Sequence, residues 1–318
     1  MLSFIIKRLI SGLTVLFFIS IITFFVLRWM PGDPATLSLG TEGTPEKIAE
    51  LQEVMGLNLP WYQQYYHWIQ DLFSGDWGSS YVFGEDVMTL IIQRLPVTLL
   101  LAAVSMVIVI PFAFIIGIMS ALFKERWVDY IARSLMQLGD AVPQFWLALI
   151  FLVFFASKLG WFPVAGYVGF DDGILASIHS VLLPAIVLAI GQVGPLIRII
   201  RSSMLSSLEQ DYMLMTQVNG LPKTLAIVKY ALRGASIAPL TIIGMQLANM
   251  LAGAILVENI FALPGIGRLL LMTVEQRDLI LLQGMVIFVT SAVVLVNILT
   301  DICYRLANPM IRFGGNHE

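Results

Sequence analysis

The sequence predicts an all-α integral membrane protein, and three observations lead to that prediction. Hydrophobic residues make up 58% of the 318 residues, whereas charged residues make up only 12%. The mean hydropathy of +0.87 lies well above that of a soluble globular domain. Six apolar stretches are each long enough to cross a bilayer, which takes roughly 20 residues, and a helix satisfies its backbone hydrogen bonds within one such stretch.

The six stretches, each expected to be a transmembrane helix, are residues 9–30, 97–123, 131–157, 178–200, 235–257 and 279–299. The first is too long for the apolar region of a signal peptide, and no small-residue cleavage site follows it, so we expect it to be retained. With the N-terminus in the cytoplasm, twelve of the eighteen Lys and Arg residues fall on the cytoplasmic side. The positive-inside rule therefore predicts that both termini are cytoplasmic.

The polar region 31–96 is predicted to be external and helical. Thr44, Pro45 and Glu46 match the N-cap, first position and acidic first turn of a short helix. An aromatic pattern from Trp61 to Leu72, followed by Gly75, predicts a second helix that anchors at the membrane interface or, alternatively, contacts the substrate. A third short helix is expected around residues 86–95, ahead of Pro96 and the second span.

The polar segment 201–234 separates the fourth and fifth apolar stretches. An amphipathic pattern there predicts a helix that stops at Gly220, with Pro222 preventing its continuation. The residues of this pattern are Asp211, Tyr212, Leu214, Met215, Val218 and Leu221. From these residues alone, the helix either lies on the bilayer surface or docks on a cytoplasmic motor protein.

Few residues within the spans carry chemistry. Asp140 lies three residues before Pro143 in the third span, where a proline kinks a helix, so it either lines a translocation path or is paired within the bundle. Asp301 is expected at the interface near Arg305, and the single cysteine, Cys303, is expected to be a buried thiol. The small residues Gly244, Ala248 and Ala252 predict a close helix contact, within the bundle or between subunits.

Catalytic and cofactor-binding patterns are absent from the sequence. It has no phosphate-binding loop of the GxxxxGK[ST] form, no HExxH and no GxSxG. The three histidines, His67, His179 and His317, are scattered over separate segments. We therefore expect no enzyme activity, no cofactor and no metal site in this chain.

A series of ordered motifs resembles the B-type permease subunit of the peptide/nickel class of ABC importers, from end to end. The motifs are Leu27-Arg28-Trp29-Met30-Pro31-Gly32-Asp33-Pro34, Met55-Gly56-Leu57-Asn58-Leu59-Pro60, Gly75-Asp76-Trp77-Gly78-Ser79-Ser80, Arg94-Leu95-Pro96-Val97-Thr98-Leu99, Pro143-Gln144-Phe145-Trp146-Leu147, Val257-Glu258-Asn259-Ile260-Phe261-Ala262-Leu263-Pro264-Gly265-Ile266-Gly267-Arg268 and Asn308-Pro309-Met310-Ile311-Arg312.

The resemblance implies the type I ABC importer transmembrane fold, with the helix around Met215 as the coupling helix on a cytoplasmic ATPase. Gly220 matches the glycine of the EAA motif, whereas Leu214, Met215 and Thr216 stand where the general motif has Glu-Ala-Ala, and Val218-Asn219 replaces the Ala-Lys of peptide permeases. The residues expected to couple transport to the ATPase are Glu209, Asp211, Tyr212, Leu214, Met215, Thr216, Val218, Asn219, Gly220 and Leu221. Asp140 and Pro143 are the candidates for the translocation path.

The resemblance also implies the rest of the assembly. A second homologous permease, two cytoplasmic ATPases that bind ATP and Mg²⁺, and an extracytoplasmic substrate-binding protein are expected in the bacterial inner membrane, with membrane lipid around the permeases and no nucleic acid. The expected domains are residues 1–30 (first span), 31–96 (external segment), 97–306 (five-helix core with the coupling loop 201–234) and 307–318 (cytoplasmic tail).

Three alternatives to peptide import stay open at this point. The same machinery could import nickel or a metal chelate. An intramembrane aspartyl protease could pair Asp140 with Asp301, although the flanking residues lack the GxGD form. A transporter that works without an ATPase is the third alternative.

Overall fold

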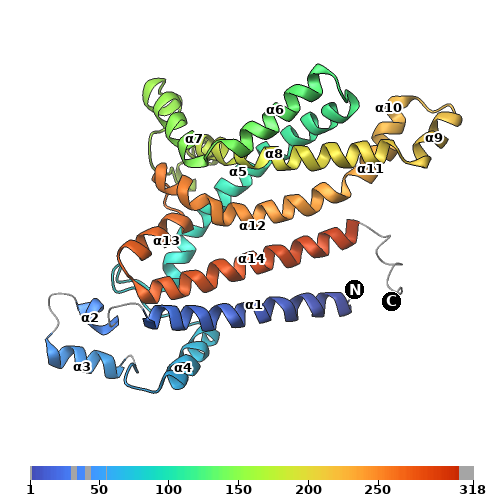
Figure 1. The fold of residues 1–318 in the computed structure, drawn as a ribbon. Helices are drawn as coiled ribbons and strands as arrows, with labels where there is room; N and C mark the ends of the chain where they lie inside the picture. The colour runs from blue at the N-terminus through green and yellow to red at the C-terminus, as the bar shows by residue number, and fades with distance from the viewer. Residues whose placement is uncertain (1, 30–33, 40–43, 55, 308–318) are drawn as a thin grey trace. The chain divides into compact units, whose positions relative to one another are not determined.

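The computed structural model describes residues 2–29, 34–39, 44–54 and 56–307. Over these ranges the regular elements are all helical, with one isolated β-bridge between Ser79 and Asp86, so the all-α class is confirmed. The elements in Figure 1 are α1 (Leu2–Trp29), α2 (Pro34–Leu39), α3 (Pro45–Val54), α4 (Trp61–Ser74), α5 (Val87–Leu122), α6 (Trp127–Ala141), α7 (Gln144–Phe151), η2 (Leu152–Lys158), η3 (Phe170–Asp172), α8 (Ile174–Leu208), α9 (Asp211–Val218), α10 (Lys223–Ala226), η4 (Ile227–Ala231), α11 (Leu232–Ala235), α12 (Ile237–Ile260), α13 (Ile266–Glu275) and α14 (Leu279–Ala307).

Four helices among the described residues are long and apolar enough to cross a membrane. They lie in α1, α5, α8 and α14. Two bent pairs of helices also qualify, the first formed by α6 with α7 and η2, and the second by α10 to α11 with α12. The described chain therefore has four candidate spans, or six if each bent pair is one span.

Two prolines behave differently from the sequence prediction. The prediction of a separate helix ahead of Pro96 is wrong, because α5 runs without interruption through Pro96 into the second span. At Pro143 the expected kink is a complete break, and the two arms meet at 97°. Val142 has an extended backbone with ψ of 120°, the conformation that a proline ring imposes on the residue before it.

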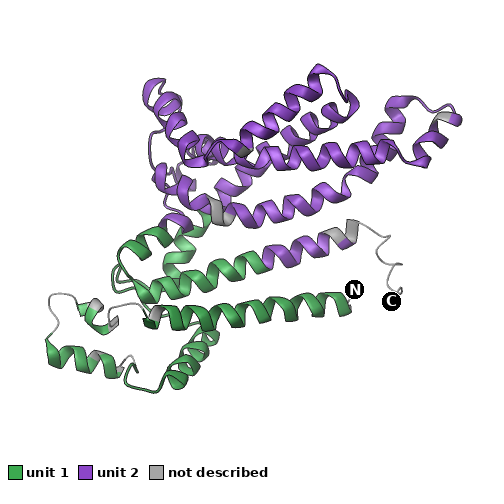
Figure 2. Cartoon of the chain, in the orientation of Figure 1, with its two compact units in different colours: residues 1–96, 269–294 green, residues 97–268, 295–318 purple. Residues whose placement is uncertain are grey.

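The chain forms two compact units, which Figure 2 distinguishes by colour. Unit 1 contains residues 1–96 and 269–294, and unit 2 contains residues 97–268 and 295–318. We describe each unit by itself.

Unit 1 confirms the helices predicted from Thr44 and from the aromatic pattern. Thr44 accepts a hydrogen bond from the backbone N–H of Lys47 through its hydroxyl (3.4 Å), and Gly75 ends α4 with φ of +91°. Helix α4 packs on α1, since the hydroxyls of Tyr65 and Ser20 are 2.8 Å apart and the rings of Tyr65 and Trp68 contact Phe24. One face of this aromatic helix is therefore held by protein.

The segment after α4 packs against the start of α14, also within unit 1. Gly78 has φ of +77°, and a Cβ there would lie 2.7 Å from the Ile280 side chain. The carboxylate of Asp278, which is fully buried, accepts hydrogen bonds from the Ser80 hydroxyl and from the backbone N–H of Leu281. The glycine and serine of this motif thus allow a close approach to α14.

Unit 2 is built around α8, which contacts α6, α7, α11 and α12. Apolar side chains of α8 are buried in two clusters, one including Ile197 and Ile200 and the other including Val187 and Leu188. Gly117 of α5 lets that helix approach closely, because a Cβ there would lie 2.7 Å from Ile200. The helices of unit 2 are therefore tightly packed along α8.

The small-residue pattern in α12 forms a contact within the chain. Gly244 is buried, and a Cβ there would lie 1.9 Å from the Thr300 side chain of α14. Ala248 is also buried, whereas the side chain of Ala252 lies outside the described residues. Cys303, expected to be buried, is exposed instead.

Candidate functional site

The predicted coupling helix is present as α9, and it begins and ends where the sequence indicates. Its last turn is closed by hydrogen bonds from the backbone N–H of Asn219 to Met215 (3.0 Å) and of Leu221 to Thr216 (3.0 Å). Gly220 then takes φ of +71°, a conformation that glycine adopts without steric cost. Pro222 caps the next helix, α10.

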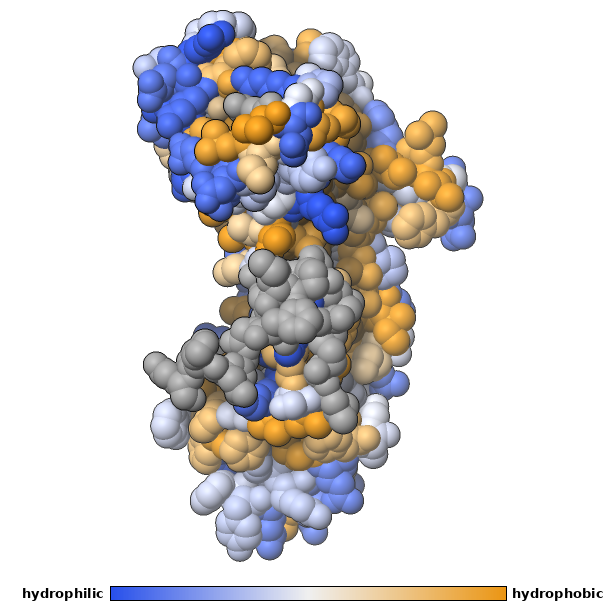
Figure 3. Space-filling model, turned by 90° about the vertical axis from the view of Figure 1, so that its right-hand side faces the viewer, coloured by the Kyte–Doolittle hydropathy of each residue, from blue (hydrophilic) through white to orange (hydrophobic). Residues whose placement is uncertain are grey.

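The apolar face of α9 points away from the protein. Leu214, Met215 and Val218 are 60%, 63% and 81% exposed, whereas Met213 is buried. Of the other predicted coupling residues, Thr216 is buried, Leu221 is half-buried, and those that are exposed are Glu209, Asp211, Tyr212, Asn219 and Gly220. In the view from the end of unit 2 that carries α9, hydrophobic residues interrupt a largely hydrophilic surface (Figure 3).

Tyr212 fastens α9 to the helices on both sides of it. Its hydroxyl bonds with the hydroxyl of Ser207 at the end of α8, and Ser207 donates to the carbonyl oxygen of Ala231 (2.8 Å). Gly234 of α11 leaves the room that the tyrosine needs, because a Cβ there would lie 2.8 Å from the Tyr212 hydroxyl. Tyr212 and Ser207 therefore link the first turn of α9 to the end of α8 and to η4.

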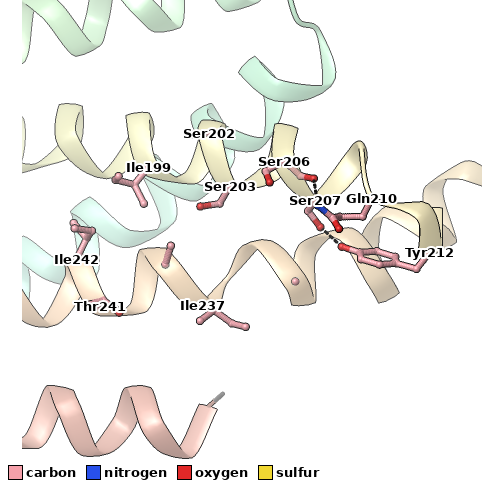
Figure 4. Close-up of a pocket in the computed structure, with 12 residues that line it drawn as sticks. Ile199, Ser202, Ser203, Ser206, Ser207, Gln210, Tyr212, Ile237, Thr241 and Ile242 are labelled. Atoms are coloured by element: carbon pink, nitrogen blue, oxygen red, sulfur yellow. Dashed lines mark hydrogen bonds between the residues drawn. The ribbon is translucent and has the colours of Figure 1, made fainter. Parts of the chain in front are cut away.

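A cavity of about 700 Å³ opens beside this junction, between α8 and the start of α12 (Figure 4). Its lining carries hydroxyl groups from both helices and from α9, namely those of Ser202, Ser203, Ser206, Ser207, Tyr212 and Thr241. Gln210 and apolar groups complete the wall, and none of the described residues that line the cavity is charged. The cavity can therefore form hydrogen bonds with a solute without favouring either sign of charge.

Asp129, in the first turn of α6, forms a buried ion pair that the sequence pattern did not predict. Its carboxylate is completely buried and forms a two-pronged ion pair with Arg201 of α8, with distances of 2.7 Å from Nε and 2.9 Å from Nη2. Arg133 adds a third charged hydrogen bond at 2.6 Å. The two partners are 72 residues apart in the sequence, and the only local signal was an acidic residue four positions before an arginine.

Glu258 is another buried carboxylate, near the end of α12. It accepts hydrogen bonds from the Thr98 hydroxyl (2.6 Å) and from the backbone N–H of Arg268 (3.0 Å). Gly265 leaves space for it, since a Cβ there would lie 2.3 Å from the carboxylate. Glu258 thus stabilises the turn between α12 and α13. In the sequence, Glu258, Gly265 and Thr98 were noted only as members of family motifs.

Of the two residues predicted to line the translocation path, the structure describes the side chain of Pro143 but not that of Asp140. Pro143 is exposed and stands at the break between α6 and α7. The side chain of Asp140, in the last turn of α6, lies outside the described residues. No group of three or more His, Cys, Asp or Glu side chains that could hold a metal ion occurs in the described ranges.

Comparisons with known proteins agree with this architecture. Residues 113–313 match the family described as binding-protein-dependent transport system inner membrane component, and residues 1–102 match its N-terminal domain. This chain belongs to that family, so it is a multi-pass protein of the bacterial inner membrane and a component of a transport system rather than an enzyme.

Several relatives are similar over their whole length. A protein of Brucella abortus (strain 2308), named provisionally as a peptide transport system permease, is 38% identical over 98% of this chain and 100% of its own. The glutathione transport system permease protein of Escherichia coli (strain K12) is 34% identical over 98% of this chain and 100% of its own. A protein of Sinorhizobium fredii (strain NBRC 101917 / NGR234), named as a peptide ABC transporter permease, is 33% identical over 98% and 99%.

Proposed function

We propose that this chain is one of two different permeases in an ATP-driven importer of di- and oligopeptides. Six spans, with both termini in the cytoplasm, form half of the path, and a homologous permease forms the other half. Two cytoplasmic ATPases, which bind ATP and Mg²⁺, drive transport, and an extracytoplasmic binding protein delivers the peptide.

The exposed apolar face of α9 is the observation on which the coupling role rests. Three large apolar side chains, Leu214, Met215 and Val218, point outward from a helix whose first turn is anchored to α8 through Tyr212. Covering such a face removes apolar surface from water, and exposed apolar patches mark sites of association. We propose a groove on a cytoplasmic ATPase as the covering surface, and the membership of this chain in a family of transport-system components supports the proposal.

The coupling mechanism follows from how α9 is attached. When two ATPases close around ATP, α9 moves with the ATPase surface on which it is docked. The Ser207–Tyr212 junction passes the displacement to α8 and η4, which reshapes the path between the two permeases. Glu209, Asp211, Asn219 and Gly220 flank this face and are exposed, so we expect them to meet the same ATPase surface.

Two observations support a peptide as the cargo. Relatives at 33% to 38% identity over nearly the whole chain are named for peptide or glutathione transport. The hydroxyl-lined cavity between α8 and α12 suits a solute that offers backbone amides and carries either charge, and we assign it to the cytoplasmic end of the path. Asp140 and Pro143 remain candidates for a deeper part of the path.

The test is uptake by the reconstituted complex. We expect proteoliposomes that contain both permeases, both ATPases and the binding protein to accumulate a labelled dipeptide or tripeptide only when ATP is present. A nickel chelate, offered in parallel, tests the alternative cargo. ATP-dependent uptake of the chelate without uptake of any peptide would overturn the peptide assignment, and uptake without ATPases would overturn the coupling role.

A further inference from the structure

We propose that Asp129 and Arg201 are positioning residues for energy coupling, which tie the end of α8 to the α5–α6 turn so that the two move as one body. The inference rests on the proposed coupling role of α9. It concerns a cluster of charges formed by α5, α6, α8 and the turn between α5 and α6.

The cluster joins four segments at one carboxylate. Asp129 Oδ1 accepts from the Ser120 hydroxyl of α5 (2.6 Å), and Oδ2 accepts from the backbone N–H of Glu125 in the turn (3.0 Å). Arg133 of α6 and Arg201 of α8 supply the remaining donors. The side chain of Asp129 is 0% exposed and that of Arg201 is 19% exposed, so water competes little for these bonds.

The geometry makes this a rigid joint rather than a loose surface pair. A planar guanidinium that binds both oxygens of one carboxylate fixes the orientation of both side chains. The turn beside it is held in an uncommon conformation, with φ of +62° at Glu125. Next to Arg201, Ile200 packs against Gly117 so closely that even a Cβ would not fit.

The position of the joint gives it a mechanical consequence. Arg201 lies seven residues before Leu208, the last residue of α8, which is about two helical turns or roughly 10 Å. Beyond Arg201, the end of α8 packs through Met204 in an apolar cluster and bonds through Ser207 to Ala231 of η4. Apolar contacts fix no direction, whereas a two-pronged ion pair does, so without the joint a force applied through α9 could shift this end of α8 relative to the α5–α6 turn. With the joint, the same force reaches α5 and α6 as well as α8.

The experiment measures peptide imported per ATP hydrolysed in proteoliposomes of the full complex. For Arg201→Met, we expect ATP hydrolysis to continue while the ratio falls about fivefold or more, the lower end of typical coupling effects between sites. Arg201→Lys, which keeps the charge but loses the two-pronged geometry, should give an intermediate ratio. Arg126→Met, which removes an exposed arginine from the same turn, is the matched control and should leave the ratio unchanged.

The outcomes separate this inference from the function on which it rests. An unchanged ratio in an assembled Arg201→Met complex overturns the inference, and so does an equal fall in import and hydrolysis. If the Arg201→Met complex does not assemble, the Arg201→Lys complex tests the inference instead. A normal ratio of peptide imported to ATP hydrolysed in an assembled Arg201→Lys complex would also overturn the inference. Failure of the unmodified complex to import peptide with ATP would instead count against the proposed function.

Discussion

Single residues fix the position of the candidate coupling helix. Gly220 ends α9 with φ of +71°, and there is open space where its side chain would be. Its role is therefore conformational, because no neighbouring group requires the absence of a Cβ. Asparagine tolerates this backbone region better than other residues, whereas proline is locked near −65°.

We expect Gly220→Pro to abolish peptide uptake, to below about a tenth of normal, while the chain still inserts in the membrane. The locked φ of proline redirects the chain between α9 and α10, so the apolar face of α9 no longer meets the ATPase. Uptake in whole cells, together with membrane fractionation, checks this. Gly220→Asn is the control and should retain most of the uptake; normal uptake by the proline variant would count against the coupling role.

Gly244 illustrates a residue whose role depends on a distant neighbour. We expect Gly244→Leu to lower the free energy of unfolding by about 1–3 kcal/mol, because the larger side chain collides with Thr300 of α14. Thermal unfolding in detergent measures the change. Gly169→Leu is the matched control, since nothing lies within 4 Å of its Cβ position; equal stability of the two variants would contradict a tight contact at Gly244.

At the scale of elements, α9 is a short helix whose outward face is apolar. We expect Met215→Glu to weaken copurification with the ATPases at least about tenfold, because a charge would be placed in a desolvated contact. Met215→Leu keeps the apolar character and should bind normally. Affinity capture of the tagged permease, followed by quantitation of the ATPase chains, measures both; full capture by the glutamate variant would rule out docking through this face.

The cavity between α8 and α12 gives a second prediction at this scale. In a Cys303→Ser background, which removes the single native cysteine, we expect a charged thiol reagent to label Ser203→Cys from the cytoplasmic side. Modification should block uptake, and trapping the ATPases in their closed state should slow labelling about fivefold or more. Ser134→Cys, on the exposed surface of α6, is the control, and its modification should leave uptake unchanged. Labelling of Ser203→Cys without loss of uptake would show that the cavity is not part of the path.

At the scale of the whole molecule, the chain has candidate spans and belongs to a family of transport-system components, which work with other subunits. We expect a tagged chain, extracted in mild detergent, to bring down a second permease and two ATPase chains. Mass spectrometry of the intact complex gives the composition. Uphill accumulation of peptide by this chain alone would contradict that expectation and the proposed mechanism with it.

The elements that the sequence determined are those governed by local chemistry. Hydropathy identified the apolar runs, and Thr44, Gly75 and Gly220 marked helix ends correctly, because capping and left-handed glycine act within a few residues. Family motifs suggested a coupling role for the loop that contains α9, and that role stays a prediction.

Other features depended on contacts between segments that lie far apart in the sequence. Pro96 lies inside a helix whereas Pro143 stands at a break between two helices, so the presence of a proline did not by itself decide which would occur. The burial of Asp129 against Arg201, of Glu258 against Thr98, and of Gly244 against Thr300 appears only once the helices are packed. Tertiary structure decided these pairings because ion pairs, buried hydrogen bonds and close packing depend on distance in space, which the order of residues in a helical bundle does not specify.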